Sequence, residues 1–322
     1  MIDADDLALL TTSFEAAMMQ GGDRVGVDAA LYDLGWGDLL DAAPRLGAAA
    51  AFALLGSTNS PASLLDDVLA ASMGLPVSSD TCVLLPVPHG AEPPGRTAGG
   101  RLLIDGLASA RIDTAERVVV PVSIDGELGL VDLTPGLLGT AHGAGLDVAR
   151  PFRRMTGIDV EFEGSISVAE DAWPDAVRDA RIALAHQLIG ASRRMLDLAR
   201  AHAVDRVQFG RSIASFQAVR HKLAESLVAI EAAAGAAEAA VGAPDDLTAA
   251  LAKSLAGKAA RVTATHAQQV LAGIGFTTEH SFHLLLKRTM VIDTLFGSAR
   301  TLPAEIGRAL LALRTAPRLV EL

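Results

Sequence analysis

A short basic turn between two long helical patterns constrains this chain more than any other segment. Within Asp205–His221, the cations Arg206 and Arg211 flank the pair Phe209-Gly210. Apolar residues recur every three or four positions on both sides, which is typical of helices with one buried face. Glycine tolerates the backbone conformations of a tight turn. We therefore expect two antiparallel helices joined here.

Two further helical patterns follow, so the C-terminal region reads as a four-helix bundle. The breaker Gly242-Ala243-Pro244-Asp245 precedes the third helix, and the fourth runs from Glu279 to about Leu295. The alanine-rich run 232–240 favours helix and close helix approach. The expected buried faces are Leu184, Leu188, Ala191, Met195 and Leu198 in the first helix, Val219, Leu223, Leu227, Ile230 and Ala234 in the second, and Leu247, Leu251, Leu255 and Val262 in the third.

The N-terminal half divides into a helical part and a β-rich part. Helical spacing covers residues 3–75, and Ser60-Pro61 predicts a helix start with a serine N-cap. Turn residues then separate short β-rich runs, and the loop His89–Gly95 is expected at the surface. The runs are Thr81–Leu85, Arg101–Ile104, Arg117–Ser123, Leu128–Leu133 and Ile158–Phe162. The predicted fold is α+β: N-terminal helical region 1–78, small middle β region 79–170, C-terminal four-helix bundle 171–322.

Composition narrows the class of protein. Half of the residues are hydrophobic, and a fifth are charged, as in folded globular proteins. The longest apolar run, Leu46–Leu55, is about half the length of a membrane-spanning helix. A net charge of -11 argues against a nucleic-acid surface. The single cysteine, Cys82, reads as a buried apolar residue and fits a reducing, cytoplasmic location.

Two segments carry a family resemblance. The first supplies Arg206, Gln208, Phe209, Gly210 and Gln217, and resembles the helix-connecting signature of FAD-dependent acyl-CoA dehydrogenases. The second, Gln269–His280, is similar to the flavin-contacting turn of that family, through Gln269 and Gly273. The resemblance implies an oligomer, in which Arg206 reaches the pyrophosphate of an FAD bound mainly by a neighbouring subunit.

Each signature also has an ordinary structural interpretation. Arg206 and Arg211 suit the C-terminal end of a helix, where the dipole favours cations. Gly273 and Gly275 suit a helix C-cap. Ala272 stands where relatives often have glycine, which implies slightly less room for a cofactor.

The catalytic carboxylate that the resemblance implies is missing. Removal of the α-proton of an acyl-CoA requires a positioned base, and most relatives place a glutamate just before a glycine. Here that position is Phe296, followed by Gly297 and then Ser298. Where other relatives take the base from the first long helix, this chain has Ala180, His186 and Gln187, with Asp179 nearby. We therefore assign no catalytic residue.

The chain resembles the base-lacking subunit of actinobacterial heteromeric acyl-CoA dehydrogenases that act on steroid side chains. This implies an α2β2 assembly with a second dehydrogenase subunit, a bulky acyl-CoA substrate, and electron-transfer flavoprotein as the acceptor. Two alternatives stay open: a self-sufficient homotetramer whose base is Asp179, and a scaffold that lost flavin and catalysis.

Two groups of residues receive weaker assignments. His266, His280 and His283 lie close in sequence without a carboxylate or thiol that completes a metal site, so packing or surface roles are favoured. Lys287 and Arg288 resemble a basic pair of relatives near the CoA phosphate, although a solvated helix face fits equally well.

Overall fold

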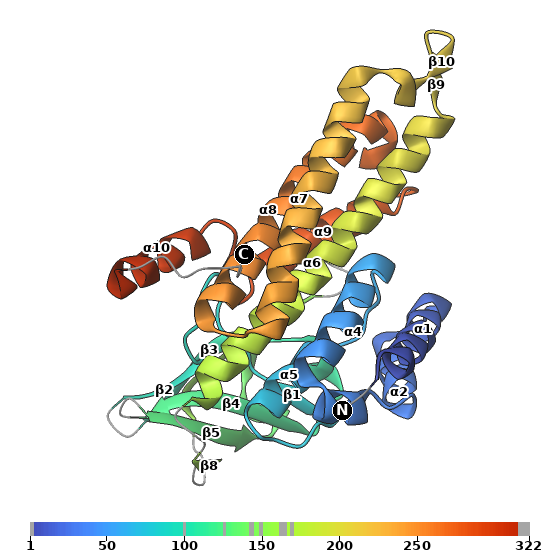
Figure 1. The fold of residues 1–322 in the computed structure, drawn as a ribbon. Helices are drawn as coiled ribbons and strands as arrows, with labels where there is room; N and C mark the ends of the chain where they lie inside the picture. The colour runs from blue at the N-terminus through green and yellow to red at the C-terminus, as the bar shows by residue number, and fades with distance from the viewer. Residues whose placement is uncertain are drawn as a thin grey trace. The chain divides into compact units, whose positions relative to one another are not determined.

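The computed structural model describes residues 3–98, 101–124, 127–141, 145–147, 151–160, 166–167 and 171–314. The chain forms two compact units, drawn as a ribbon in Figure 1. The first comprises residues 1–48, 61–180 and 294–297, and the second residues 49–60, 181–293 and 298–322. Within the described residues, no helix is long and apolar enough to cross a membrane.

The first unit begins with short helices, as expected. They are α1 (Ala4–Gln20), α2 (Arg24–Asp33), α3 (Trp36–Ala42), the start of α4 (Pro44–Thr58) and α5 (Leu65–Ser72). Ser60 is not an N-cap, because α5 starts at Leu65. The residues before α5 are held in other bonds: the Ser63 amide donates to Asp28, and the Ser63 carbonyl accepts from Arg111.

An eight-stranded sheet completes the first unit. Its order is β6-β7-β3-β2-β4-β5-β8, with β1 parallel to β4. The strands are β1 (Thr81–Val83), β2 (Gly95–Ala98), β3 (Arg101–Ala108), β4 (Arg117–Ile124), β5 (Glu127–Leu133), β6 (Gly139–Ala141), β7 (Arg153–Val160) and β8 (Ile166–Ser167). The β-rich prediction is confirmed, except that β2, β6 and β8 were missed, and residues 161–162 of one predicted run lie outside the described residues.

The loop His89–Gly95 is less exposed than predicted. Pro94 and Gly95 are buried, and Gly95 is the first residue of β2. A Cβ atom at Gly95 would lie 2.7 Å from Cγ2 of Val122, so the strand packs too closely for a larger residue. Cys82 in β1 is fully buried, as predicted, and burial raises the pKa of its thiol.

A buried ionic network ties the helices of the first unit to its sheet. The guanidinium of Arg111, with no exposed surface, forms a bidentate pair with Asp67. Asp67 also accepts from Tyr32 (2.7 Å) and Trp36 (2.9 Å). The adjacent Asp66 accepts from the Val83 amide and from the Ser109 hydroxyl. Buried charges are tolerated where they are paired and hydrogen-bonded in this way.

The second unit is helical. It contains the later part of α6 (Ala172–Asp205), then α7 (Gln217–Gly242), α8 (Asp246–Leu271), α9 (Phe282–Asp293) and α10 (Leu302–Leu313). The four predicted helices are present, and α10 is additional. The start of α8 carries a capping box between Asp245 and Thr248, which explains why the helix begins at Asp246, two residues after Pro244.

Small residues allow these helices to approach closely. A Cβ atom at Gly56 of α4 would lie 2.0 Å from the Gln187 carbonyl of α6, and one at Gly190 would lie 2.1 Å from the Ala53 carbonyl. Glycine is therefore required at both positions of this crossing. In α8 the buried face is likewise formed mostly by alanines.

Two predicted buried faces are wrong in part. In α8, the predicted residues Leu247, Leu251, Leu255 and Val262 are only half-buried, and the buried residues are mostly alanines. Leu227 is 49% exposed in this chain. The buried face of α7 is formed instead by Ser226, Ile230, Ala233, Ala234, Ala237 and Ala240. The sequence pattern placed Leu227 in the buried face because it is the larger apolar residue. The helices lie close together, however, so the small alanine side chains fit between them.

Candidate functional site

A two-residue β-hairpin joins α6 to α7. Strands β9 (Val207–Gln208) and β10 (Arg211–Ser212) pair antiparallel. The turn residues Phe209 and Gly210 both have positive φ, 52° and 75°. Two positive φ values match the tight turns whose twist suits a hairpin. Gly210 therefore has a conformational role.

One aromatic side chain of this hairpin region is strongly exposed, and a second is half-buried. Phe209 is 91% exposed, and its ring meets Phe216 edge-on at 6.2 Å. The guanidinium of Arg211 lies 4.4 Å from the centre of the Phe216 ring. Arg211 therefore stacks on an aromatic ring. Arg206 is exposed, and within the described part of the chain its guanidinium has no ion-pair partner.

The second signature lies where α8 ends. The C-cap residue is Ala272, with φ of 50°, a backbone conformation that favours glycine. Gly273 does not have positive φ, so it is not the glycine C-cap considered at the sequence level. A Cβ atom at Gly273 would meet no atom within 4 Å. Neither backbone strain nor packing inside the described chain requires glycine there.

Both signatures line one pocket of about 660 Å³ in the second unit. Of the predicted residues, Arg206, Gln208, Phe209, Gln269 and Gly273 line it. Gly210 and Gln217 do not: Gly210 shapes the turn, and Gln217 is the first residue of α7. The sequence interpretation missed the other lining residues, among them His202, Ile213, Phe216, Val219, Lys222, Val270 and Leu271.

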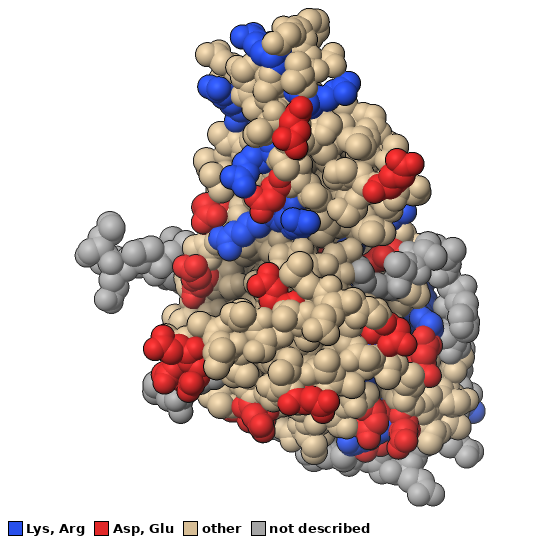
Figure 2. All heavy atoms as spheres, turned by 90° about the vertical axis from the view of Figure 1, so that its right-hand side faces the viewer, with Lys and Arg blue, Asp and Glu red and all other residues tan. Residues whose placement is uncertain are grey.

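The pocket combines cations with apolar walls. Arg206 and Lys222 supply positive charge, and Figure 2 shows Lys and Arg side chains gathered over the helices at the top of that view. Burial lowers the pKa of His202, and the neighbouring Arg206 and His280 lower it further, against Asp205. His202 is therefore largely uncharged at neutral pH. The site suits a ligand that has both an anionic and an aromatic part.

The position expected for a catalytic base is a buried aromatic residue. Phe296, in the first unit, is 1% exposed and has φ of 54°, and Gly297 follows with φ of 93°. The ring of Trp173 lies 6.3 Å from that of Phe296, and the Trp173 indole donates to the Ala91 carbonyl. A phenyl side chain cannot accept a proton, so this position supplies no base.

The alternative base positions of α6 are occupied or unsuitable. Asp179 accepts from Arg45 Nε at 2.7 Å and from Ser72 Oγ at 3.0 Å, so both of its oxygens bind within the first unit. Burial lowers the pKa of His186 to about 4, and Arg193 adds to this. Ala180 and Gln187 are buried.

The remaining candidates have structural surroundings. His266 lies against Ser226 and Glu225, and His280 Nδ1 accepts from the Phe282 amide. Among the described residues, no three His, Cys, Asp or Glu side chains are grouped as metal ligands would be. Lys287 and Arg288 belong to α9 and do not line the pocket.

Comparison with known proteins identifies the helical region. Residues 175–311 match the family model of the acyl-CoA dehydrogenase C-terminal domain. This helical region is therefore similar to the C-terminal domain of acyl-CoA dehydrogenases. Acyl-CoA dehydrogenase IpdE2 of Mycobacterium tuberculosis is 40% identical over 139 residues, 42% of either chain. The chain thus spans about two fifths of the length of the IpdE2 relatives that it matches.

Solved structures extend the likeness to the whole fold. The steroid acyl-CoA dehydrogenase Tcur3481-Tcur3483, as its G363A variant, has a TM-score of 0.80 at 19% identity, covering 97% of this chain and 99% of the other. The ChsE4-ChsE5 complex from Mycobacterium tuberculosis has a TM-score of 0.74 at 20% identity, covering 98% of each. These matches confirm the predicted acyl-CoA dehydrogenase fold. A further structure of this fold, PigA with FAD and proline, has a TM-score of 0.77 at 16% identity, so FAD is a cofactor that a protein of this fold binds.

Proposed function

We propose that the chain is a subunit of a heteromeric, FAD-dependent acyl-CoA dehydrogenase, in which it completes a flavin site while a partner subunit supplies the catalytic base. One observation carries this proposal. Five residues of two separate family signatures line a single pocket, whereas the family's base position is a buried phenylalanine. The chain therefore has residues suited to face a cofactor, but the family's base position holds no residue that could abstract the α-proton.

The lining residues fit part of a flavin dinucleotide. Arg206 and Lys222 would hold its pyrophosphate through charge-assisted hydrogen bonds. Phe209 offers an exposed ring for stacking, and the unopposed space at Gly273 leaves room for close approach. When bound, FAD supplies the hydride acceptor of an α,β-dehydrogenation.

The exposure of the same residues supports a shared site. The Phe209 ring is 91% exposed, so nearly all of its apolar surface is available to a bound cofactor or partner. Because Phe209 lies on a tight two-residue turn between the end of α6 and the start of α7, it would contact a cofactor or protein docked against this chain. We assign that partner as a second dehydrogenase subunit in an α2β2 assembly.

The substrate is proposed to be a bulky acyl-CoA, with steroid side chains as the leading case and electron-transfer flavoprotein as the acceptor. Support comes from the likeness to the steroid acyl-CoA dehydrogenase Tcur3481-Tcur3483 and to the ChsE4-ChsE5 complex. The acyl group is not encoded by any residue described above, so this assignment depends on that likeness.

The test is the visible spectrum of the chain purified alone and with a candidate partner, followed by an acyl-CoA without electron acceptor. We expect flavin only in the complex, and bleaching of its absorbance by substrate. Flavin that the chain binds and reduces alone would favour the self-sufficient enzyme. In that case Asp179→Asn should abolish bleaching if Asp179 is the base. Absence of flavin from both samples would favour a scaffold.

A further inference from the structure

A histidine lies among the cations of the pocket that the two signatures share. His202 and Arg206 line this pocket from α6, and Lys222 lines it from α7. The Arg206 amide donates to the His202 carbonyl at 2.9 Å, so the two side chains are one helical turn apart on the same face of α6. The pocket therefore brings one titratable ring together with two groups that are cationic at neutral pH.

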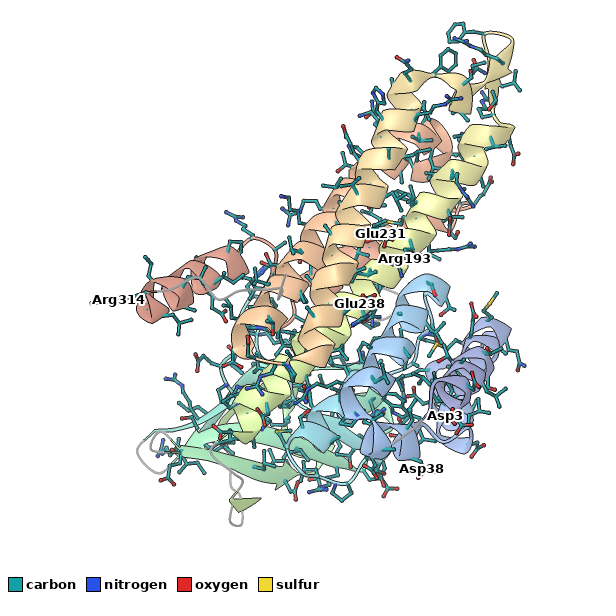
Figure 3. The ribbon with its side chains drawn as sticks, viewed as in Figure 1. Asp3, Asp38, Arg193, Glu231, Glu238 and Arg314 are labelled. Carbon is teal, nitrogen blue, oxygen red and sulfur yellow. The ribbon has the colours of Figure 1, made fainter. Side chains whose placement is uncertain are left out.

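No acid balances these charges inside the pocket. Among the described residues, no Asp or Glu lines it, and neither Arg206 nor Lys222 has an ion-pair partner. The pattern differs elsewhere on the same two helices, because Arg193 of α6 pairs with Glu231 of α7 at 3.2 Å (Figure 3). Charge between α6 and α7 is thus paired away from the pocket and unpaired within it, which suits an anionic ligand.

The protonation of His202 depends on the charges around its ring. Burial lowers its pKa, and the positive charge of Arg206 and the nearby His280 lower it further. Only Asp205 acts in the opposite direction. The charged or titratable groups around the ring are Asp205 and Arg206 on α6, Lys222 on α7 and His280 before α9, whereas α8 contributes the uncharged Gln269 and Val270 to the pocket.

We propose that His202 takes up a proton when a pyrophosphate diester binds beside Arg206 and Lys222, so that the pocket holds its ligand more tightly as the pH falls. The two negative charges of the diester offset the two cations and remove the repulsion that disfavours an imidazolium there. A hydrogen bond from the ring to a phosphate oxygen would favour the charged form further. Identifying the diester with FAD rests on the proposed function, whereas the proton uptake follows from the pocket itself.

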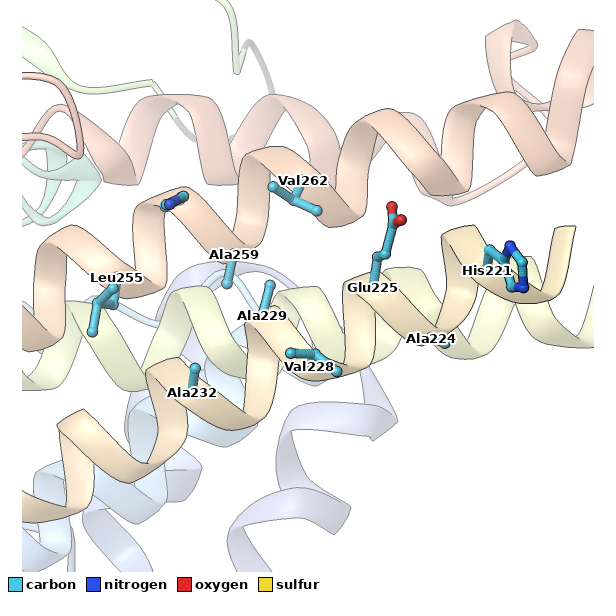
Figure 4. Close-up of a pocket in the computed structure, with 10 residues that line it drawn as sticks. His221, Ala224, Glu225, Val228, Ala229, Ala232, Leu255, Ala259 and Val262 are labelled. Atoms are coloured by element: carbon cyan, nitrogen blue, oxygen red, sulfur yellow. The ribbon is translucent and has the colours of Figure 1, made fainter. Parts of the chain in front are cut away.

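NMR titration of the histidine rings in the full chain tests the proton uptake, with ADP-ribose as the diester and adenosine as its uncharged counterpart. ADP-ribose should raise the titration midpoint of His202, assigned through His202→Gln, by about one pH unit, and adenosine should not. His221 is the internal control, because it lines a separate cavity of about 540 Å³ between α7 and α8 (Figure 4). An unmoved His202 midpoint, or an equal shift of His221, overturns the inference.

FAD titrations of the heteromeric complex separate this inference from the proposed function. Affinity should be about fivefold higher at pH 5.5 than at pH 7.5, as a rise of about one pH unit in the His202 midpoint requires. His202→Gln should remove this difference, and His221→Gln should keep it. FAD binding that is independent of pH overturns the inference and leaves the proposed function standing. A raised His202 midpoint in a complex that binds no FAD overturns the proposed function and leaves the proton uptake standing.

Discussion

Two arginines, one in each unit, have opposite surroundings. Arg111 has no exposed surface, and its guanidinium binds Asp67 and the carbonyl of Ser63. Arg206 is exposed and has no ion-pair partner within the described residues. Within the described residues, the fold supplies hydrogen-bond partners for both terminal nitrogens of Arg111, although its buried Nε has none, whereas it supplies no ion-pair partner for Arg206. Polar groups that a chain leaves unused, next to exposed aromatic rings, point to a ligand or partner outside it.

The strongest test of this contrast is Arg111→Met. Removing one partner of a buried pair leaves Asp67 without its counter-charge, at a cost of about 3–5 kcal/mol. Arg206→Ala should change the unfolding free energy by less than about 0.5 kcal/mol, as is usual at the surface. Urea denaturation measures both. Equal effects of the two substitutions would remove the distinction.

For flavin binding we expect the opposite order: substitution of Arg206 should have a large effect. Arg206→Ala should weaken flavin retention in the heteromeric complex about 10–100-fold, since hydrogen bonds to charged groups contribute about 1.5–3 kcal/mol. Arg200→Ala, an exposed arginine in the same segment, is the control and should retain flavin. Dialysis followed by absorbance gives the affinity. A loss shared by Arg200→Ala would show that net charge, rather than the pocket, holds the cofactor.

Gly56 and Gly273 allow the same comparison for the space around a residue, because one is tightly packed and the other is not. Gly56→Ala should destabilise the chain by about 1–3 kcal/mol, because its Cβ would overlap the Gln187 carbonyl. Gly273→Ala should leave stability nearly unchanged and reduce flavin binding. Thermal unfolding and flavin content, measured side by side, separate the two effects. A stable Gly56→Ala variant would mean that α4 and α6 can shift apart.

The smallest expected effect is on the pH dependence of the unfolding free energy, through the buried Lys253. Burial lowers the pKa of Lys253 to about 8, although Asp293 opposes this. Above pH 8 the folded chain releases this proton while the unfolded chain keeps it up to about pH 10.5, so the unfolding free energy should rise with pH in that window. The rise is at most about 1.4 kcal/mol per pH unit. Lys253→Met should abolish it, and exposed Lys258→Met should not, in urea titrations at pH 7.5 and 9.5.

Features that depend on local sequence could be predicted, whereas features that depend on how distant segments pack could not. The four helices and most strands follow from apolar periodicity and from breakers such as Pro244. The pocket-lining residues Arg206, Phe209, Gln269 and Gly273 followed from local signatures. Lys222 and His202 were missed because their role depends on how α6, α7 and α8 are arranged. The Arg111 network joins α2, α3, α5 and the sheet, so no local pattern reveals it. Leu227 was misplaced because periodicity alone does not show that alanines set the helix spacing.

The packing of Phe296 has a consequence for how such a chain can change over generations. A single Phe296→Glu substitution would place a carboxylate at a site that is 1% exposed and faces the Trp173 ring. Burial without a counter-charge would destabilise the fold or keep that acid protonated. Regaining a base therefore requires a second change that opens the surroundings of residue 296 before selection could favour the first. Under the proposed function, dependence on a partner subunit would be easy to acquire through this position and difficult to lose.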